Sequence, residues 1–175
     1  MATDADAEFS ALVQHQSRFV FKVAYAVLLN SHDAEDAVQE TFLKLYRHAG
    51  WKEAENERAY LARVAWRVAI DHKRRSSSSA AAAEDPQLLD AFASSHAGPH
   101  EAISEANQQA TVHALIDSLP EDLRVPLVLS AFEELNSREI GQILSIPEGT
   151  VRTRLQRARQ ILRQKLTSTK ETHYV

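Results

Sequence analysis

Apolar side chains recur at spacings of three and four residues along most of this chain, which is the period of one face of an α-helix. In the N-terminal part this pattern predicts three helices, over residues 8–29, 33–48 and 56–74. A loop is expected over residues 49–58, overlapping the start of the third helix. No segment alternates strongly between apolar and polar residues, and the chain has only four glycines and five prolines. The pattern therefore predicts an all-α protein.

Residues 136–166 predict two further helices joined by a tight turn. Ser137 is the expected N-cap of the first, and Glu139 lies in its first turn, where a carboxylate suits the helix dipole. Gly141 is small enough for a second helix to cross closely, and Pro147 interrupts the helical pattern. The second helix has one apolar face, made by Val151, Leu155, Ala158 and Leu162. A short helix, a turn and a longer basic helix predict a helix-turn-helix, whose second helix enters the DNA major groove.

The stretch between these two parts, residues 76–107, is rich in serine, alanine and acidic residues. Such a composition is typical of a linker. We therefore expect two small helical domains, residues 1–75 and 108–175, joined by a flexible acidic linker. The C-terminal domain would contain the helix-turn-helix.

Charge is distributed unevenly around this organisation. The whole chain carries a net charge of −4. Residues 59–75 hold five Lys or Arg and one acid, and residues 137–175 hold eight Lys or Arg and three acids. Two basic blocks on an acidic chain suggest two nucleic-acid contacts. The alternative is that each basic block is only the solvated face of a helix.

Several features bound the chemistry. The chain has no cysteine, so it has neither disulfides nor thiolate metal sites, and we expect no metal and no cofactor. No apolar run is long enough to span a membrane, so no membrane insertion is expected, and the acidic N-terminus is not a secretory signal. The simplest location is cytoplasmic. Four carboxylates raise a metal-dependent nuclease as an alternative, but no further ligand completes a metal site: Asp33, Glu35, Asp36 and Glu40.

Three sequence blocks together resemble the bacterial RNA polymerase sigma factors of the sigma-70 family, and more narrowly the extracytoplasmic-function (ECF) group. Residues 33–47, DAEDAVQETFLKLYR, resemble the helix of that family that binds core polymerase. Residues 59–75, AYLARVAWRVAIDHKRR, resemble the helix that melts and reads the −10 promoter element. The block LIDSLPEDLRVPLVLSAFEELNSREIGQILSIPEGTVRTRLQRAR resembles the domain that reads the −35 element.

The resemblance implies a role for each block. The clamp helices of the largest polymerase subunit would meet Asp36, Gln39, Glu40 and Leu43. The −10 element would be bound by Trp51, Arg63, Trp66, Arg67, Asp71, Lys73, Arg74 and Arg75. The −35 element would be bound by Thr150, Arg152, Thr153, Arg154, Gln156 and Arg157, with Arg152, Thr153 and Gln156 nearest the base edges.

The resemblance further implies core RNA polymerase, including its upstream-facing flap region, and promoter DNA as partners. It allows an anti-sigma factor as a third partner. It also implies that the protein has no active site, so that DNA opening is driven by binding alone. Two positions depart from the family pattern, because Arg67 stands where Asn is usual and Ser145 where Gly is usual. A helix-turn-helix regulator that never meets polymerase remains an alternative. It leaves residues 33–40 and the first basic block unexplained.

Overall fold

The computed structural model describes residues 4–79, 99–132 and 134–172, and within them every regular element is a helix. In chain order these are α1 (Asp4–Leu28), α2 (Ser31–Arg47), a short 3-10 helix η1 (Ala49–Glu53), α3 (Glu57–Ser79), α4 (Pro99–Asp117), α5 (Glu121–Ser130), α6 (Ser137–Leu144) and α7 (Glu148–Thr172). The expected all-α class is confirmed. Most of the segment expected to be a linker lies outside the described residues. At its two ends α3 continues to Ser79 and α4 begins at Pro99.

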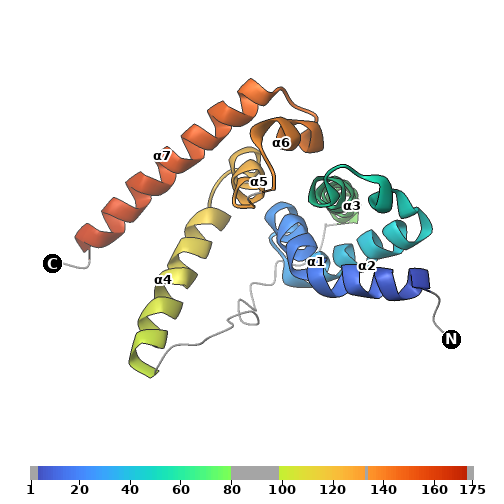
Figure 1. Cartoon of the computed structure of the whole chain (residues 1–175). Coiled ribbons are helices and arrows are strands. Elements are labelled where there is room, and N and C mark those ends of the chain that lie inside the picture. Colours follow the sequence, from blue (N-terminus) through green and yellow to red (C-terminus); the bar gives the residue numbers. More distant parts are fainter. Residues whose placement is uncertain (1–3, 80–98, 133, 173–175) are drawn as a thin grey trace.

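The first three helices pack against one another as the first domain (Figure 1). Their apolar stripes meet in a core in which Val20, Val23, Leu45, Leu61 and Val68 are at most 1% exposed. The helical spacing of these residues places each of them on the inward face of its helix. The three N-terminal helices predicted from the sequence are therefore confirmed, with shifts of a few residues at their ends.

The second domain contains α4 to α7, with the helix-turn-helix formed by α6 and α7. Asn136, not Ser137, is the N-cap of α6, so the predicted cap was wrong by one residue. The Asn136 side chain accepts from the backbone N–H of Glu139 at 3.0 Å, and the Glu139 carboxylate accepts from the backbone N–H of Asn136 at 2.9 Å. This reciprocal pair, a capping box, satisfies two backbone donors that a helix start leaves free.

The turn between α6 and α7 depends on two positions. Ser145 has φ 56° and ψ 42°, the left-handed conformation that glycine adopts at least cost. The serine therefore takes the turn geometry that the family reaches with glycine. Gly141 allows the close crossing predicted for it, because a Cβ there would lie 2.7 Å from the backbone oxygen of Ile146.

The two domains are in direct contact. Helix α5 lies against α1, and α6 lies against α3, as Figure 1 shows. One continuous apolar core runs through both domains, since Val20 and Leu61 of the first belong to the same buried cluster as Leu129 and Ile140 of the second. The sequence pattern gave no indication of this packing.

Candidate nucleic-acid interface

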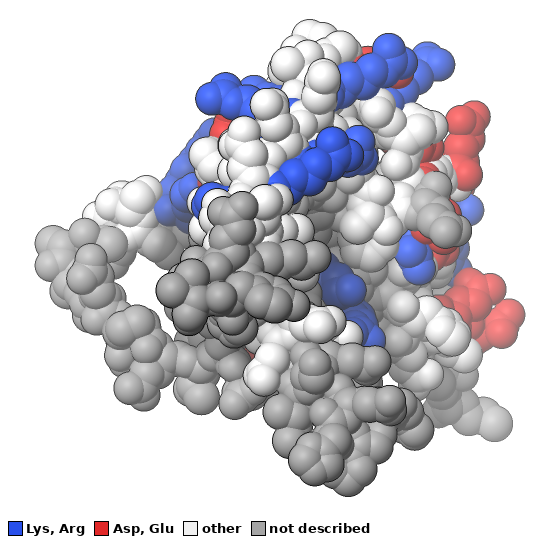
Figure 2. Space-filling model, turned by 90° about the vertical axis from the view of Figure 1, so that its left-hand side faces the viewer, with Lys and Arg blue, Asp and Glu red and all other residues white. Residues whose placement is uncertain are grey.

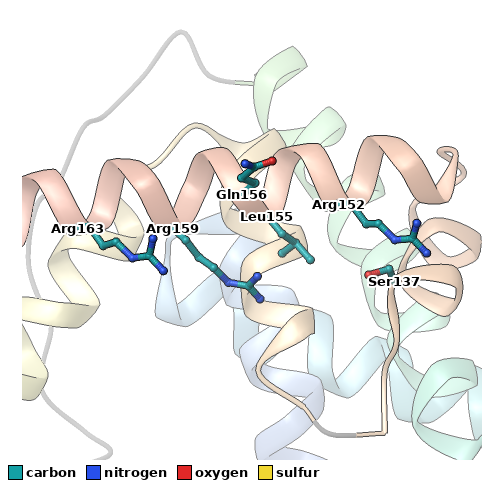
Figure 3. Close-up of a pocket in the computed structure, with 6 residues that line it drawn as sticks. All are labelled: Ser137, Arg152, Leu155, Gln156, Arg159 and Arg163. Carbon is teal, nitrogen blue, oxygen red and sulfur yellow. The ribbon is translucent and has the colours of Figure 1, made fainter.

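An open groove of about 300 Å³ runs along α7 beside the start of α6 (Figure 3). It is lined by Ser137, Arg152, Leu155, Gln156, Arg159 and Arg163. The lining is dominated by three guanidinium groups and two neutral polar side chains, and no carboxylate contributes to it. Groups of this kind bind phosphate oxygens and the acceptor edges of bases.

The groove follows from the way α7 is buried. Val151, Leu155 and Ala158 are at most 5% exposed and face the rest of the domain. The polar lining residues 152, 156, 159 and 163 are separated by steps of four, three and four, so they form one stripe beside the buried face. At about 1.5 Å per residue this stripe is about 16 Å long. Helix α6 adds Ser137 at one end.

Charge on this surface is largely unopposed. Arg152 forms an ion pair with Glu148 one turn earlier on α7. Arg159 and Arg163 form no ion pair within the described part of the chain. Figure 2 shows Lys and Arg side chains gathered over the upper part of the molecule, with most of the Asp and Glu side chains of this face at one edge.

The structure places the six residues expected to bind the −35 element in different surroundings. Arg152 and Gln156 line the groove, and both are exposed. Thr153 and Arg157 are exposed outside it, whereas Thr150 and Arg154 are half-buried. The Thr153 hydroxyl donates to the carbonyl of Gly149 at 3.0 Å.

The sequence analysis missed three groove residues: Ser137, Arg159 and Arg163. The helical spacing from Arg152 could have found the two arginines, because positions seven and eleven residues later lie on the same side of a helix. Nothing in the sequence could have found Ser137, because it comes from another helix.

A second basic surface lies on α3. Four residues expected to bind the −10 element follow one exposed stripe: Arg63, Arg67, Asp71 and Arg74. Two others are already paired inside the molecule. Lys73 forms an ion pair with Glu121 of α5, and Arg75 forms one with Glu40 of α2 at 3.2 Å.

The aromatic residues near α3 are partly buried. Trp51 in η1 and Trp66 in α3 both pack against the apolar core, as does Tyr60. The ring of Trp51 lies 6.4 Å from that of Phe9, and Lys52 lies over it at 5.4 Å. Each of these aromatics therefore fills space in the fold. A stacking role in DNA binding stays a prediction.

The expected polymerase-binding surface on α2 is largely exposed. Asp36, Gln39 and Leu43 face outward, and the Leu43 side chain is 56% exposed beside Tyr46 at 58%. Exposed large apolar side chains so close together are typical of a surface that meets a partner. Among the described residues, no group of three or more potential ligands is placed to hold a metal ion, and this includes the carboxylates of α2.

Glu40 differs from these three. Its carboxylate turns toward α3, where it contacts His72 Nε2 at 2.7 Å and Arg75 at 3.2 Å, and it also contacts Lys44 at 3.4 Å. Desolvation is the largest single influence and raises the pKa of Glu40. The hydrogen bonds from His72, Arg75 and Lys44 together outweigh it and hold the pKa below its usual value. Glu40 therefore ties α2 to the C-terminal half of α3.

Comparison with known proteins assigns a family to each half. The family model described as Sigma-70 region 2 matches residues 12–79, and the one described as Sigma-70, region 4 matches residues 109–162. The ECF RNA polymerase sigma factor SigE of Mycolicibacterium smegmatis is 34% identical over 150 residues, which are 86% of this chain and 58% of that protein. SigW of Bacillus subtilis, another ECF RNA polymerase sigma factor, is 31% identical over 170 residues, which are 93% of this chain and 90% of that protein.

Two solved structures share the fold. The sigma factor RpoE of Bartonella quintana, in complex with the anti-sigma factor NepR, matches with a TM-score of 0.71 at 18% identity, over 91% of this chain and 97% of that one. CnrH, in complex with the cytosolic domain of CnrY, matches with a TM-score of 0.60 at 20% identity, over 91% and 88% of the two chains. None of the helices described here has the length and apolar character to cross a bilayer.

Proposed function

The chain belongs to the ECF group of the sigma-70 family and is a transcription initiation factor, not an enzyme, and from this premise we propose which of its surfaces meet polymerase and which meet DNA. The observation that carries the proposal is the placement of two basic surfaces on two different domains, one on α3 and one on α7. A single duplex contact would need only one of them. Two contacts suit a factor that binds two promoter elements.

The groove on α7 would hold the upstream element. Arg152 and Gln156 are long, exposed and near the start of α7, where a recognition helix meets base edges. Arg159 and Arg163 lie farther along the same stripe, about 10 to 16 Å from Arg152 at about 1.5 Å per residue. Since the major groove is about 12 Å wide, we place these two arginines against the phosphates at its margin.

The exposed stripe of α3 would bind the opened −10 element, with Arg63, Arg67 and Arg74 neutralising phosphate charge. Capture of a single strand by a basic surface offsets the cost of unpairing a few base pairs. The outward face of α2, with Asp36, Gln39 and Leu43, would contact the polymerase clamp helices. Glu40 would support that face from behind through its contacts with α3. A cytoplasmic location, a contact with the polymerase flap and a cognate anti-sigma factor are part of the same proposal.

Transcription with purified components tests the proposed function against its alternatives. The full chain is added to core RNA polymerase on a set of promoter templates, and transcripts are mapped. Transcripts that begin at one promoter class, and only with the chain present, are expected. Tight duplex binding with no effect on core polymerase would support a classical helix-turn-helix regulator instead. Divalent-metal-dependent cleavage of the template would support a nuclease.

Replacing Arg152 and Gln156 by alanine should remove reading of the upstream element. Each lost base contact weakens discrimination by about 1 to 3 kcal/mol, so the preference for the native upstream element should fall at least about tenfold. The measurement is promoter binding by the polymerase complex, with native and scrambled upstream elements. Binding to a pre-melted promoter should be retained, because it depends on the first domain. Loss of core binding by these variants would contradict the division of labour.

Replacing Arg163 by alanine should weaken binding to all sequences alike. A phosphate contact carries no sequence information, so the plot of log affinity against log salt should lose about one unit of slope. The same plot for Arg18→Ala, which removes an exposed arginine from α1, serves as the matched control and should keep the full slope. An unchanged slope for Arg163→Ala would place that residue off the DNA.

A further inference from the structure

The two domains meet through polar contacts at the start of α3. The amide of Asn56 donates to the backbone oxygen of Glu134 at 2.7 Å and to the Glu139 carboxylate at 2.8 Å. Asn56 is itself the residue whose side-chain oxygen accepts from Ala59 N–H at the beginning of α3. Arg58 adds an ion pair with Glu134 at 3.0 Å. The loop that precedes α3 is thereby joined to the capping carboxylate of α6.

An aromatic cluster reinforces this junction. The rings of Phe19 in α1 and Phe132 after α5 lie 4.6 Å apart, edge to face at 88°. The guanidinium of Arg58 lies over both rings, 5.2 Å from Phe19 and 5.8 Å from Phe132. Aromatic pairs and cations over rings in this geometry attract one another.

Two more contacts extend the junction along α1 and α3. Arg124 of α5 donates through Nε to the backbone oxygen of Ala26 in α1 at 2.6 Å and is 5% exposed. Glu121 of α5 pairs with Lys73 of α3. The second domain therefore occupies a surface on which hydrogen bonds, ion pairs and buried apolar side chains all match it.

This arrangement does not fit simultaneous binding to both promoter elements. Elements centred at −10 and −35 lie about 25 base pairs apart, which is about 85 Å of duplex at about 3.4 Å per base pair. Here Asn56, in the loop expected at the −10 element, is in hydrogen-bond contact with α6. Ser137, which lines the arginine groove, lies in the first turn of that helix. The two DNA-binding surfaces meet at one corner of the molecule.

We propose that the surface formed by α1 and the start of α3 is a docking site for the α5–α6 segment of the same chain, and that this docked form is unable to engage a promoter. The proposal rests on the proposed function, since it needs both promoter contacts. The docked form also holds Lys73 in an ion pair with the second domain and keeps Asn56 and Arg58 from DNA. Only the separated form reaches both elements, so apparent promoter affinity falls with the fraction of separated molecules.

Domain separation can be measured directly by energy transfer between two dyes. The chain has no cysteine, so Ser10→Cys on α1 and Gln164→Cys on α7, both exposed, give two specific labelling sites. The free protein is expected to show one population with high transfer. Addition of core polymerase with promoter DNA should move it to low transfer.

Glu134→Lys in the labelled chain is the test of the interface. Glu134 is exposed, and its replacement sets a lysine against Arg58, so the high-transfer population of the free protein should shrink. Asp122→Lys makes the same charge change at another exposed position of the second domain and should leave transfer unchanged. Glu134→Lys combined with Arg58→Glu restores opposite charges and should restore the high-transfer population. Phe132→Ala, which removes the ring contact with Phe19, should act in the same direction as Glu134→Lys.

The two proposals fail in distinguishable ways. Low transfer in the free wild-type chain, or equal transfer for Glu134→Lys and Asp122→Lys, would overturn the docked form. Either result would leave promoter-directed transcription untouched. If the docked form holds and the separated fraction is small, a tenfold increase in that fraction by Glu134→Lys should tighten promoter binding by the free chain about tenfold.

Discussion

Replacing Arg124 by methionine is expected to lower the free energy of unfolding by about 3 kcal/mol. The guanidinium is almost fully buried, and it donates to three backbone carbonyls: Ala26 at 2.6 Å, Leu119 at 2.6 Å and Asp117 at 3.3 Å. Methionine fills a similar volume but donates nothing. The buried oxygens would then lose their charged donor, and each buried acceptor left without one costs about 1 to 3 kcal/mol.

The position of these carbonyls explains the size of the effect. Ala26 lies in the last turn of α1, and Asp117 is the last residue of α4. The last carbonyls of a helix have no partner within it and carry partial negative charge. Neither helix has a basic residue in its own last turn. Arg124 therefore supplies one positive charge to two helix ends.

Burial acts against this arrangement, because desolvation lowers the pKa of the Arg124 guanidinium. The nearby Glu121, Asp117 and Tyr25 act in the opposite direction and favour the charged form. Asp117 also accepts from the Tyr25 hydroxyl of α1 at 3.3 Å. The charged residue is thus kept in place by acceptors from both domains.

Chemical denaturation followed by circular dichroism measures the loss. Arg138→Met removes an exposed arginine from α6 and is the matched control, with an expected change of less than about 0.5 kcal/mol. A denaturation midpoint for Arg124→Met equal to that of the control would show that the buried guanidinium contributes no net stability. Domain separation, measured by energy transfer as above, should also increase in Arg124→Met.

Replacing Gly141 by alanine is expected to disrupt the helix-turn-helix and with it recognition of the upstream element. A Cβ at this position would lie 2.7 Å from the backbone oxygen of Ile146, which is closer than two such atoms can approach. The backbone on the other side of the turn cannot rotate away as a side chain would. Overpacking of this kind costs about 1 to 3 kcal/mol, which exceeds the gain of about 1 kcal/mol from alanine's helix propensity when the clash is relieved only in part.

The functional effect should exceed the loss of stability. Relief of the clash must shift α6 against α7, and the groove is lined by residues from both helices. Affinity for the native upstream element should therefore fall at least about tenfold, as for a lost base contact. Binding by the polymerase complex and the denaturation midpoint are measured together on the same variant.

Gly149→Ala is the control for this substitution. Nothing lies within 4 Å of a Cβ at position 149, and Gly149 does not adopt a positive φ. Alanine there should be neutral or should stabilise α7 by up to about 1 kcal/mol. Equal behaviour of the two alanine variants would show that the close crossing at Gly141 does not constrain the turn.

The sequence predicted the local structure of the chain well, because helical periodicity is a property of neighbouring residues. The helices of the first domain, the helix-turn-helix and the close crossing at Gly141 were all predicted from spacing and residue type. The error at the cap of α6 has a local cause. Asn136 and Ser137 are both good N-caps, and the choice follows from Glu139, which reaches back three residues to Asn136 in the capping box.

Prediction of the site was less complete. Arg152 and Gln156 were placed correctly on the exposed side of the recognition helix, and Arg159 and Arg163 could have been found by extending the same helical stripe. Glu40 was expected to face a partner, yet its carboxylate is held by His72 and Arg75 of α3. An exposed stripe on one helix does not reveal which of its members a neighbouring helix will hold.

By itself the sequence determined that this protein is all-α, that it belongs with the sigma factors and that one basic face lies on each domain. Each of these is written in periodicity, charge or short motifs, which need no knowledge of the fold. Only the tertiary structure decided that Ser137 joins the arginine groove, that Arg124 serves two helix ends and that the two domains dock together. These depend on contacts such as Asn56 to Glu139, between residues 83 positions apart. Their formation depends on the geometry of packed helices, which no local pattern encodes.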